Sequence, residues 1–80
     1  MTPEDALEII NKGELPIMES ELSRPIEKAL VGSIKGLSPI LASYITDQAD
    51  IDDRKTLSML TDSQKTSLIN AVMDFLKSIR

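Results

Sequence analysis

Cysteine, histidine and tryptophan are absent from the 80-residue sequence. Without thiolate and imidazole side chains, the chain lacks the usual ligands of zinc, the commonest general base, a thiol nucleophile and any disulfide. The length allows one small domain, not the two-lobed cleft that many enzymes use. We therefore expect no catalytic residues, no metal site and no cofactor, and we predict that the protein is not an enzyme.

Long apolar runs and targeting segments are lacking as well. The longest uncharged stretch, residues 36–46, has eleven residues including a proline, whereas a membrane-spanning helix needs about 20 apolar residues. The first dozen residues carry acidic side chains and no apolar run after a basic stretch, so no signal peptide is predicted. We expect a soluble, cytoplasmic protein without a membrane partner.

Acidic residues are in excess but unevenly distributed. Thirteen Asp and Glu against nine Lys and Arg give a net charge of −4, which disfavours a general polyanion binder. Residues 1–27 carry two bases and seven acids, and residues 47–63 carry two bases and five acids. Residues 28–46, in contrast, contain two lysines and no acid. A contact with phosphate is therefore expected in this acid-free stretch.

Start and stop signals divide the chain into helices. Thr2-Pro3 and Ser38-Pro39 each place a capping residue before a proline, which is typical of a helix start. Thr61 and Gln64 form a capping box, and Gly13 and Gly36 are positioned to end helices. The apolar spacing then predicts helices over residues 3–12, 25–35, 39–49 and 62–79, with at most one helical turn in residues 14–22 and 56–60.

A sheet has no support, because the sequence shows neither alternating β-branched runs nor Asn-Gly or Asp-Gly hairpin signals. We predict an all-α fold, a small bundle of four to five short helices that forms a single domain over residues 1–80. The helix start directly after Met1 and the end at Arg80 inside an apolar periodic segment suggest a fragment of a longer protein.

Residues 25–49 have the pattern of a helix-hairpin-helix motif. Ile34, Gly36, Leu37 and Ala42 occupy the apolar, glycine, apolar and alanine positions of that motif, while Ser38 stands at its second glycine. Glycine allows a positive φ, and a small residue at 42 allows close helix approach. The same residues also fit a plain helix-turn-helix corner without ligand.

The start of the helix after the turn is a candidate anion site. Its first backbone N–H groups, those of Ser38, Ile40 and Leu41, have no partner within the helix and are expected to point outward. Lys28 and Lys35 lie on or beside the turn and supply positive charge. The predicted nucleic-acid-binding residues are Lys28, Lys35, Gly36, Leu37, Ser38, Ile40 and Leu41.

The string at residues 36–42, Gly-Leu-Ser-Pro-Ile-Leu-Ala, resembles the Gly-apolar-Ser-Pro-Leu-apolar-Ala signature of the NFACT family, the fibronectin-binding protein A-like proteins of bacteria. Serine at the second glycine position is usual in that family. The resemblance covers about residues 22–80, including the acidic loop after the hairpin and the capped last helix. Many relatives carry Arg-Glu where this chain has Ser43-Tyr44.

The resemblance implies a multidomain factor of ribosome-associated quality control, which binds tRNA and the large ribosomal subunit and helps to add alanine tails to stalled nascent chains. Its implied partners are tRNA or ribosomal RNA, neighbouring domains of the same chain and fibronectin, since such proteins are also described as adhesins at the cell surface. This segment would be the small helical domain between an N-terminal lobe and a coiled coil. Of the functional residues that the resemblance implies, only those of the hairpin are assigned to positions of this chain.

Two other classes of function stay open. One is a purely structural or docking domain that makes no nucleic-acid contact. The other, more remote, is an acyl carrier protein, whose modified serine follows an aspartate as Ser63 follows Asp62, although Gln64 stands where a leucine is expected. The aspartates of residues 47–53 lack the glycine and the final glutamate of a calcium loop, so we interpret them as a solvated acidic loop.

Overall fold

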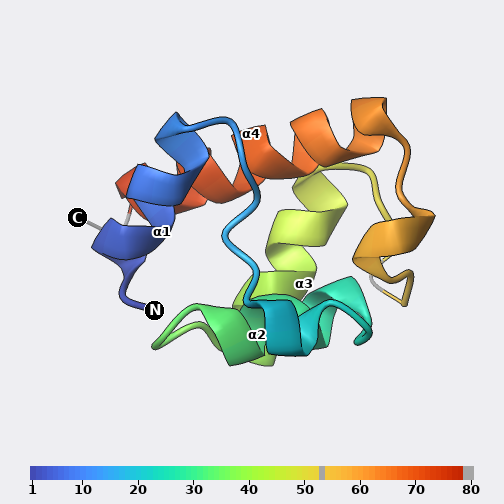
Figure 1. Ribbon diagram of the computed structural model, residues 1–80, viewed down its shortest axis with the longest axis horizontal. Helices are drawn as coiled ribbons and strands as arrows, with labels where there is room; N and C mark the ends of the chain where they lie inside the picture. The colour runs from blue at the N-terminus through green and yellow to red at the C-terminus, as the bar shows by residue number, and fades with distance from the viewer. Residues whose placement is uncertain (53, 79–80) are drawn as a thin grey trace.

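The computed structural model describes residues 1–52 and 54–78, and in this part of the chain it contains helices and no strand (Figure 1). The helices are α1 (Pro3–Asn11), α2 (Ile26–Ser33), α3 (Pro39–Gln48) and α4 (Asp62–Ser78), with two short 3-10 turns, η1 (Glu19–Glu21) and η2 (Leu57–Met59). The predicted all-α fold is confirmed. No described helix is both long and apolar enough to cross a membrane.

Both ends of α1 and the start of α4 lie where the capping residues predict them. The Asp5 N–H donates to Thr2 Oγ1 (3.2 Å) at the start of α1, and Gly13, just after this helix, has a φ of 83°. At the start of α4 the Gln64 N–H donates to Thr61 Oγ1 (3.2 Å), and the Thr61 N–H donates to Gln64 Oε1 (3.0 Å). The predicted capping box is therefore present with both of its hydrogen bonds.

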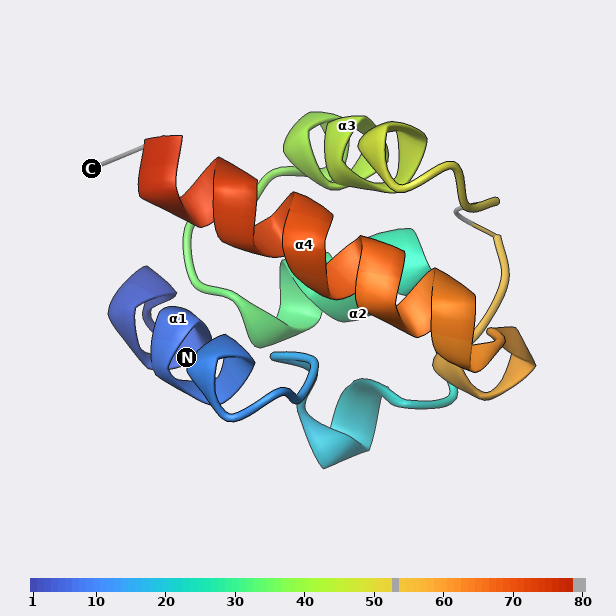
Figure 2. The ribbon, with the colours of Figure 1, turned by 90° about the horizontal axis from the view of Figure 1, so that it is seen from above.

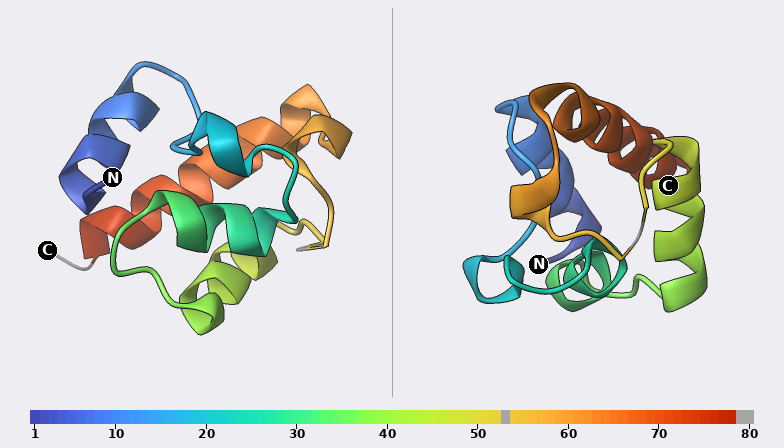
Figure 3. Two further views of the ribbon diagram at one scale, coloured as in Figure 1. Left: turned by 60° about the horizontal axis from the view of Figure 1, so that its bottom comes forward. Right: turned by 90° about the vertical axis from the view of Figure 1, so that its right-hand side faces the viewer.

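The four helices surround one core. α4 lies along one side of the molecule and α2 along the opposite side, with α3 between them (Figure 1). From above, α4 crosses over α2, and α1 and α3 flank it (Figure 2). The corner between α2 and α3 lies at the edge of the molecule, as both views of Figure 3 show. The largest fully buried side chains include Ile26, Leu30, Ile34, Ile45, Leu68, Val72 and Leu76.

The second helix is shorter than the predicted range of residues 25–35 and ends at Ser33. Ile34 has extended backbone angles, φ −106° and ψ 118°, and its side chain is buried in the core. The Lys35 N–H then donates to the carbonyl of Met1 (2.6 Å). Tertiary packing of Ile34 thus ends the helix before Gly36. Asp53 of the predicted acidic loop, Ile79 of the predicted last helix and the terminal Arg80 lie outside the described residues.

The connector, residues 12–25, joins α1 to α2 across the front of the molecule in Figure 1. Pro16 is fully buried, and the Ile17 N–H donates to the Leu15 carbonyl (2.9 Å), which closes a tight turn around the proline. Farther along, the Met18 N–H donates to the buried Ser33 Oγ (2.8 Å) of α2. The connector is therefore fixed to the core at two points.

Candidate nucleic-acid interface

The turn between α2 and α3 depends on one glycine and one capping serine. Gly36 has a φ of 86°, and the Leu37 N–H donates to the Ile34 carbonyl (3.3 Å). The Leu37 side chain is buried. Ser38 has extended backbone angles and Pro39 is the first residue of α3. The positive φ predicted for Gly36 is confirmed, whereas Leu37, which is only 7% exposed, contributes mainly to packing.

Two of the three predicted amide donors are available at the start of α3. In the described part of the chain, no hydrogen bond involves the backbone N–H of Ser38 or of Ile40. The N–H of Leu41 is not free, because it donates to Ser38 Oγ (3.3 Å). The first turn of α3 contains no acidic residue, so the partial positive charge of this helix end is not opposed locally. The available donors are therefore those of Ser38 and Ile40.

The two predicted lysines are exposed but line different hollows. Lys28 lies beside Pro39 in a hollow of about 290 Å³, which we call the Lys28 hollow. Lys35 lies beside Gly36 and Leu41 in a hollow of about 220 Å³. The structure thus brings each lysine to the start of α3, but it does not gather both into one pocket.

Arg24 is a residue that the sequence reasoning missed. It lines the Lys28 hollow together with Glu27 and Lys28, and its Nε lies 3.1 Å from Glu21 Oε2. The Glu21 carboxylate rests against Gly32, where an added Cβ would come within 2.7 Å of Glu21 Cδ. The available signal was the spacing of Arg24 and Lys28, four residues apart at the start of a predicted helix.

An apolar surface lies beside the candidate anion site. Ile40 and Tyr44 are 81% and 55% exposed, and their spacing of four residues puts both on one face of α3. No charged residue occurs in α3 before Asp47. The hairpin therefore presents two kinds of surface, an amide site with flanking lysines and an uncharged apolar face.

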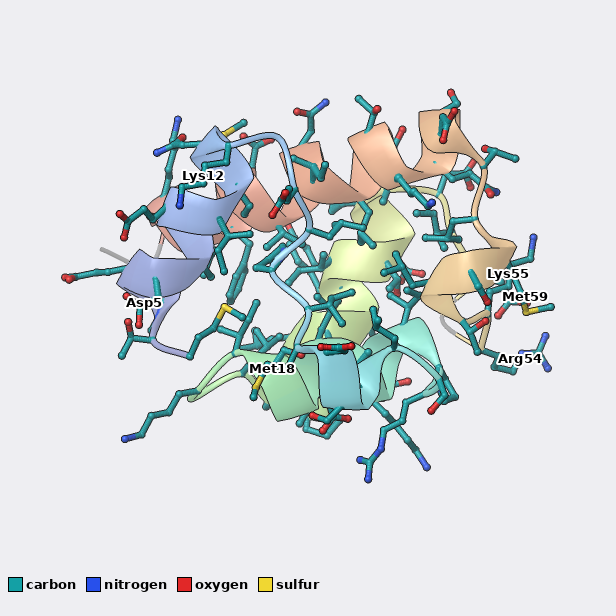
Figure 4. The ribbon with its side chains drawn as sticks, in the orientation of Figure 1. Asp5, Lys12, Met18, Arg54, Lys55 and Met59 are labelled. Atoms are coloured by element: carbon teal, nitrogen blue, oxygen red, sulfur yellow. The ribbon has the colours of Figure 1, made fainter. Side chains whose placement is uncertain are left out.

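In the acidic loop, Asp52 is paired with a basic residue of the same loop, Arg54. Arg54 donates to Asp52 through its side chain (Nε to Oδ1, 3.2 Å) and its backbone N–H (3.0 Å), and these bonds hold the pKa of the Asp52 carboxyl below its usual range. Arg54 and Lys55 project at the far end of the molecule from α1 (Figure 4). At least one loop carboxylate is therefore compensated within the loop itself.

Replacing Gly36 by alanine is expected to lower the free energy of unfolding by about 1 kcal/mol. Apart from the two chain neighbours, no described residue has an atom within 4 Å of a Cβ added at this position, so the expected cost comes from the positive φ. Asparagine tolerates this conformation better, and Gly36→Asn should cost less. Urea unfolding measures both variants, and an alanine variant as stable as the natural protein would contradict the assignment.

Comparison with family models, curated proteins and solved structures finds no match for this chain. The interpretation of the site therefore depends on the geometry of the hairpin and on the sequence signature at residues 36–42. Of these residues, Gly36, Ser38 and Ile40 form the accessible candidate site together with Lys35.

Proposed function

We propose that this chain is the helix-hairpin-helix module of a fibronectin-binding protein A-like NFACT protein, and that its hairpin contacts the backbone of tRNA or ribosomal RNA during ribosome-associated quality control. The observation that carries the proposal is the left-handed turn at Gly36, after which the Ser38 and Ile40 amides have no partner among the residues that the structure describes. Backbone amides at a helix start are suited to bind a phosphate group. The cytoplasm is the setting that this proposal requires.

The local charge around the hairpin supports an anion contact despite the net charge of −4. Residues 28–46 contain no acid, and Lys35 directly precedes the turn. At physiological salt, charges are screened beyond about 8 Å, so the acidic segments oppose the approach of RNA more than they oppose the final contact. Each neutralised phosphate adds a salt-dependent contribution to affinity. Binding by the isolated domain should be weak and without sequence preference, because phosphate contacts do not distinguish bases.

The proposal is tested by titrating a short RNA stem-loop into the ¹⁵N-labelled domain at low salt and following the backbone amides by NMR. We expect the amides of residues 36–42 to shift first and Lys35→Glu to abolish these shifts. Lys12→Glu is the matched control, because it makes the same charge change at an exposed lysine at the end of α1, away from α2 (Figure 4).

Three results would contradict the RNA contact. These are shifts confined to residues 62–78, equal loss of shifts in both lysine variants, and no shifts at millimolar RNA and low salt. Equal loss would indicate attraction by overall charge and not a contact at the hairpin. Binding by the unmodified domain that disappears as salt is raised would be consistent with the proposal.

A second candidate function, docking to a neighbouring domain, is favoured by the exposure of Ile40 and Tyr44 on α3. Large apolar side chains exposed together often mark a protein contact. In this case Tyr44→Ser would weaken association with the rest of the protein added as a separate polypeptide, while RNA-induced shifts would be unchanged. The two functions are therefore separable by one variant and two measurements.

A further inference from the structure

A groove separate from the hairpin lies between the connector, η2 and the beginning of α4, and it has a volume of about 420 Å³. The connector forms the front of this region in Figure 1, and α4 runs above it. The apolar side chains that line the groove are Leu15, Ile17, Leu22, Leu57 and Ile69. None of the five is fully buried, and Leu22 is 40% exposed. The groove is therefore an apolar surface that the described chain leaves uncovered.

The walls of the groove are held in place by contacts to the core. Pro16 is buried, and the turn around it puts both of its neighbours, Leu15 and Ile17, along the groove. The hydrogen bond from the Met18 N–H to Ser33 Oγ fixes the connector at the residue that follows Ile17. A preformed site of this kind binds a ligand without the entropic cost of ordering its own side chains and backbone.

The charges at the groove favour a basic ligand. Glu14 and Asp62 line it, opposed by Lys65. The charged side chains that line the groove therefore carry one more negative than positive charge, whereas residues 28–46 around the hairpin contain no acid.

We propose that this groove binds a basic peptide segment of a partner protein, with one or two leucine or phenylalanine side chains in the groove and lysine or arginine side chains directed at Glu14 and Asp62. Apolar anchors supply most of the binding energy in such grooves, and complementary charge selects the partner and speeds the encounter. The inference does not depend on the RNA contact, since the groove and the hairpin share no lining residue.

The test uses a synthetic peptide, Lys-Leu-Leu-Lys-Lys-Phe-Leu-Lys, and a second peptide in which every lysine is replaced by glutamate. Each is titrated into the ¹⁵N-labelled domain and followed by NMR. We expect the basic peptide to shift the amides of Leu15, Ile17, Leu57 and Ile69, and the acidic peptide to leave them unchanged. Equal binding of both peptides, or shifts confined to residues 36–42, would overturn the proposal.

Charge variants separate a specific site from general attraction. Glu14→Lys should weaken binding of the basic peptide by about fivefold and Lys65→Glu should strengthen it by a similar factor, because the two changes act in opposite directions on the same groove. An unchanged affinity in both variants would contradict the role of charge in this groove, and therefore the inference that the partner segment is basic.

The apolar contact is tested by Leu22→Ser, for which we expect about tenfold weaker binding. Met59→Ser is the matched control, since Met59 is 62% exposed on η2, is not part of the groove lining and projects away from the molecule (Figure 4). Circular dichroism tests whether both variants fold. Equal affinities for the two variants would contradict an anchor in the groove.

Discussion

Replacing Ile45 by alanine is expected to lower the free energy of unfolding by about 3 kcal/mol, whereas Ile40→Ala should change it by less than about 0.5 kcal/mol. Both isoleucines belong to α3, so the two substitutions change helix propensity almost equally. Ile45 is fully buried, and its truncation leaves a cavity lined by other apolar side chains of the core; Ile40 is 81% exposed. The difference between the variants therefore isolates the contribution of burial.

The effect of Ile45→Ala would be large for a chain of this length, since small domains have a total stability of roughly 0.05–0.15 kcal/mol per residue. Urea unfolding monitored by circular dichroism gives the free energies of both variants and of the natural protein. Similar losses for Ile40→Ala and Ile45→Ala would show that α3 does not pack with the face described here.

A larger side chain at Ala42 is expected to destabilise the protein by about 2 kcal/mol or more. Ala42 is completely buried in α3, the helix that packs against both α2 and α4. Leucine at this position would have to displace neighbouring side chains or push the helices apart, and overpacking of this kind costs about 1–3 kcal/mol. The same substitution tests whether the hairpin needs a small residue where its two helices meet.

Ala71→Leu is the control for Ala42→Leu, because it adds the same atoms in the middle of another helix. Ala71 is partly exposed and lines a hollow of about 290 Å³ with Tyr44 and Phe75. We expect a neutral or slightly stabilising effect there, since the added side chain has space to occupy. Thermal unfolding compares the two variants, and comparable destabilisation by both would indicate a general intolerance of larger side chains.

Local chemistry predicts much of the fold. The capping residues Thr2, Ser38 and Thr61 mark three helix starts, and Gly36 adopts the predicted positive φ. Asp50 also has a positive φ, 56°, which the sequence does not announce because a non-glycine residue rarely adopts it. The early end of α2 is likewise set by packing that no local pattern contains.

The candidate site was predicted less completely than the fold. Ser38 was identified as a helix cap, and a capping side chain usually accepts from the amide two or three residues on, so the loss of the Leu41 amide follows from the cap itself. Arg24 lines the Lys28 hollow because the start of α2 lies beside Pro39 of α3. This proximity depends on how the two helices pack, which the sequence does not show. The groove between the connector, η2 and α4 combines segments about 40 residues apart, a proximity that periodicity within one segment does not reveal.

The contact between Glu21 and Gly32 has a consequence for how this sequence can vary. An added Cβ at position 32 would lie less than 3 Å from three atoms of the Glu21 carboxylate group. The Glu21 side chain is 15% exposed and is paired with Arg24. Any larger residue at 32 would force the end of the Glu21 side chain, and with it the paired Arg24 guanidinium, to take a new position. We therefore expect the two positions to vary together, so that a homologue with a side chain at 32 carries a shorter residue at 21.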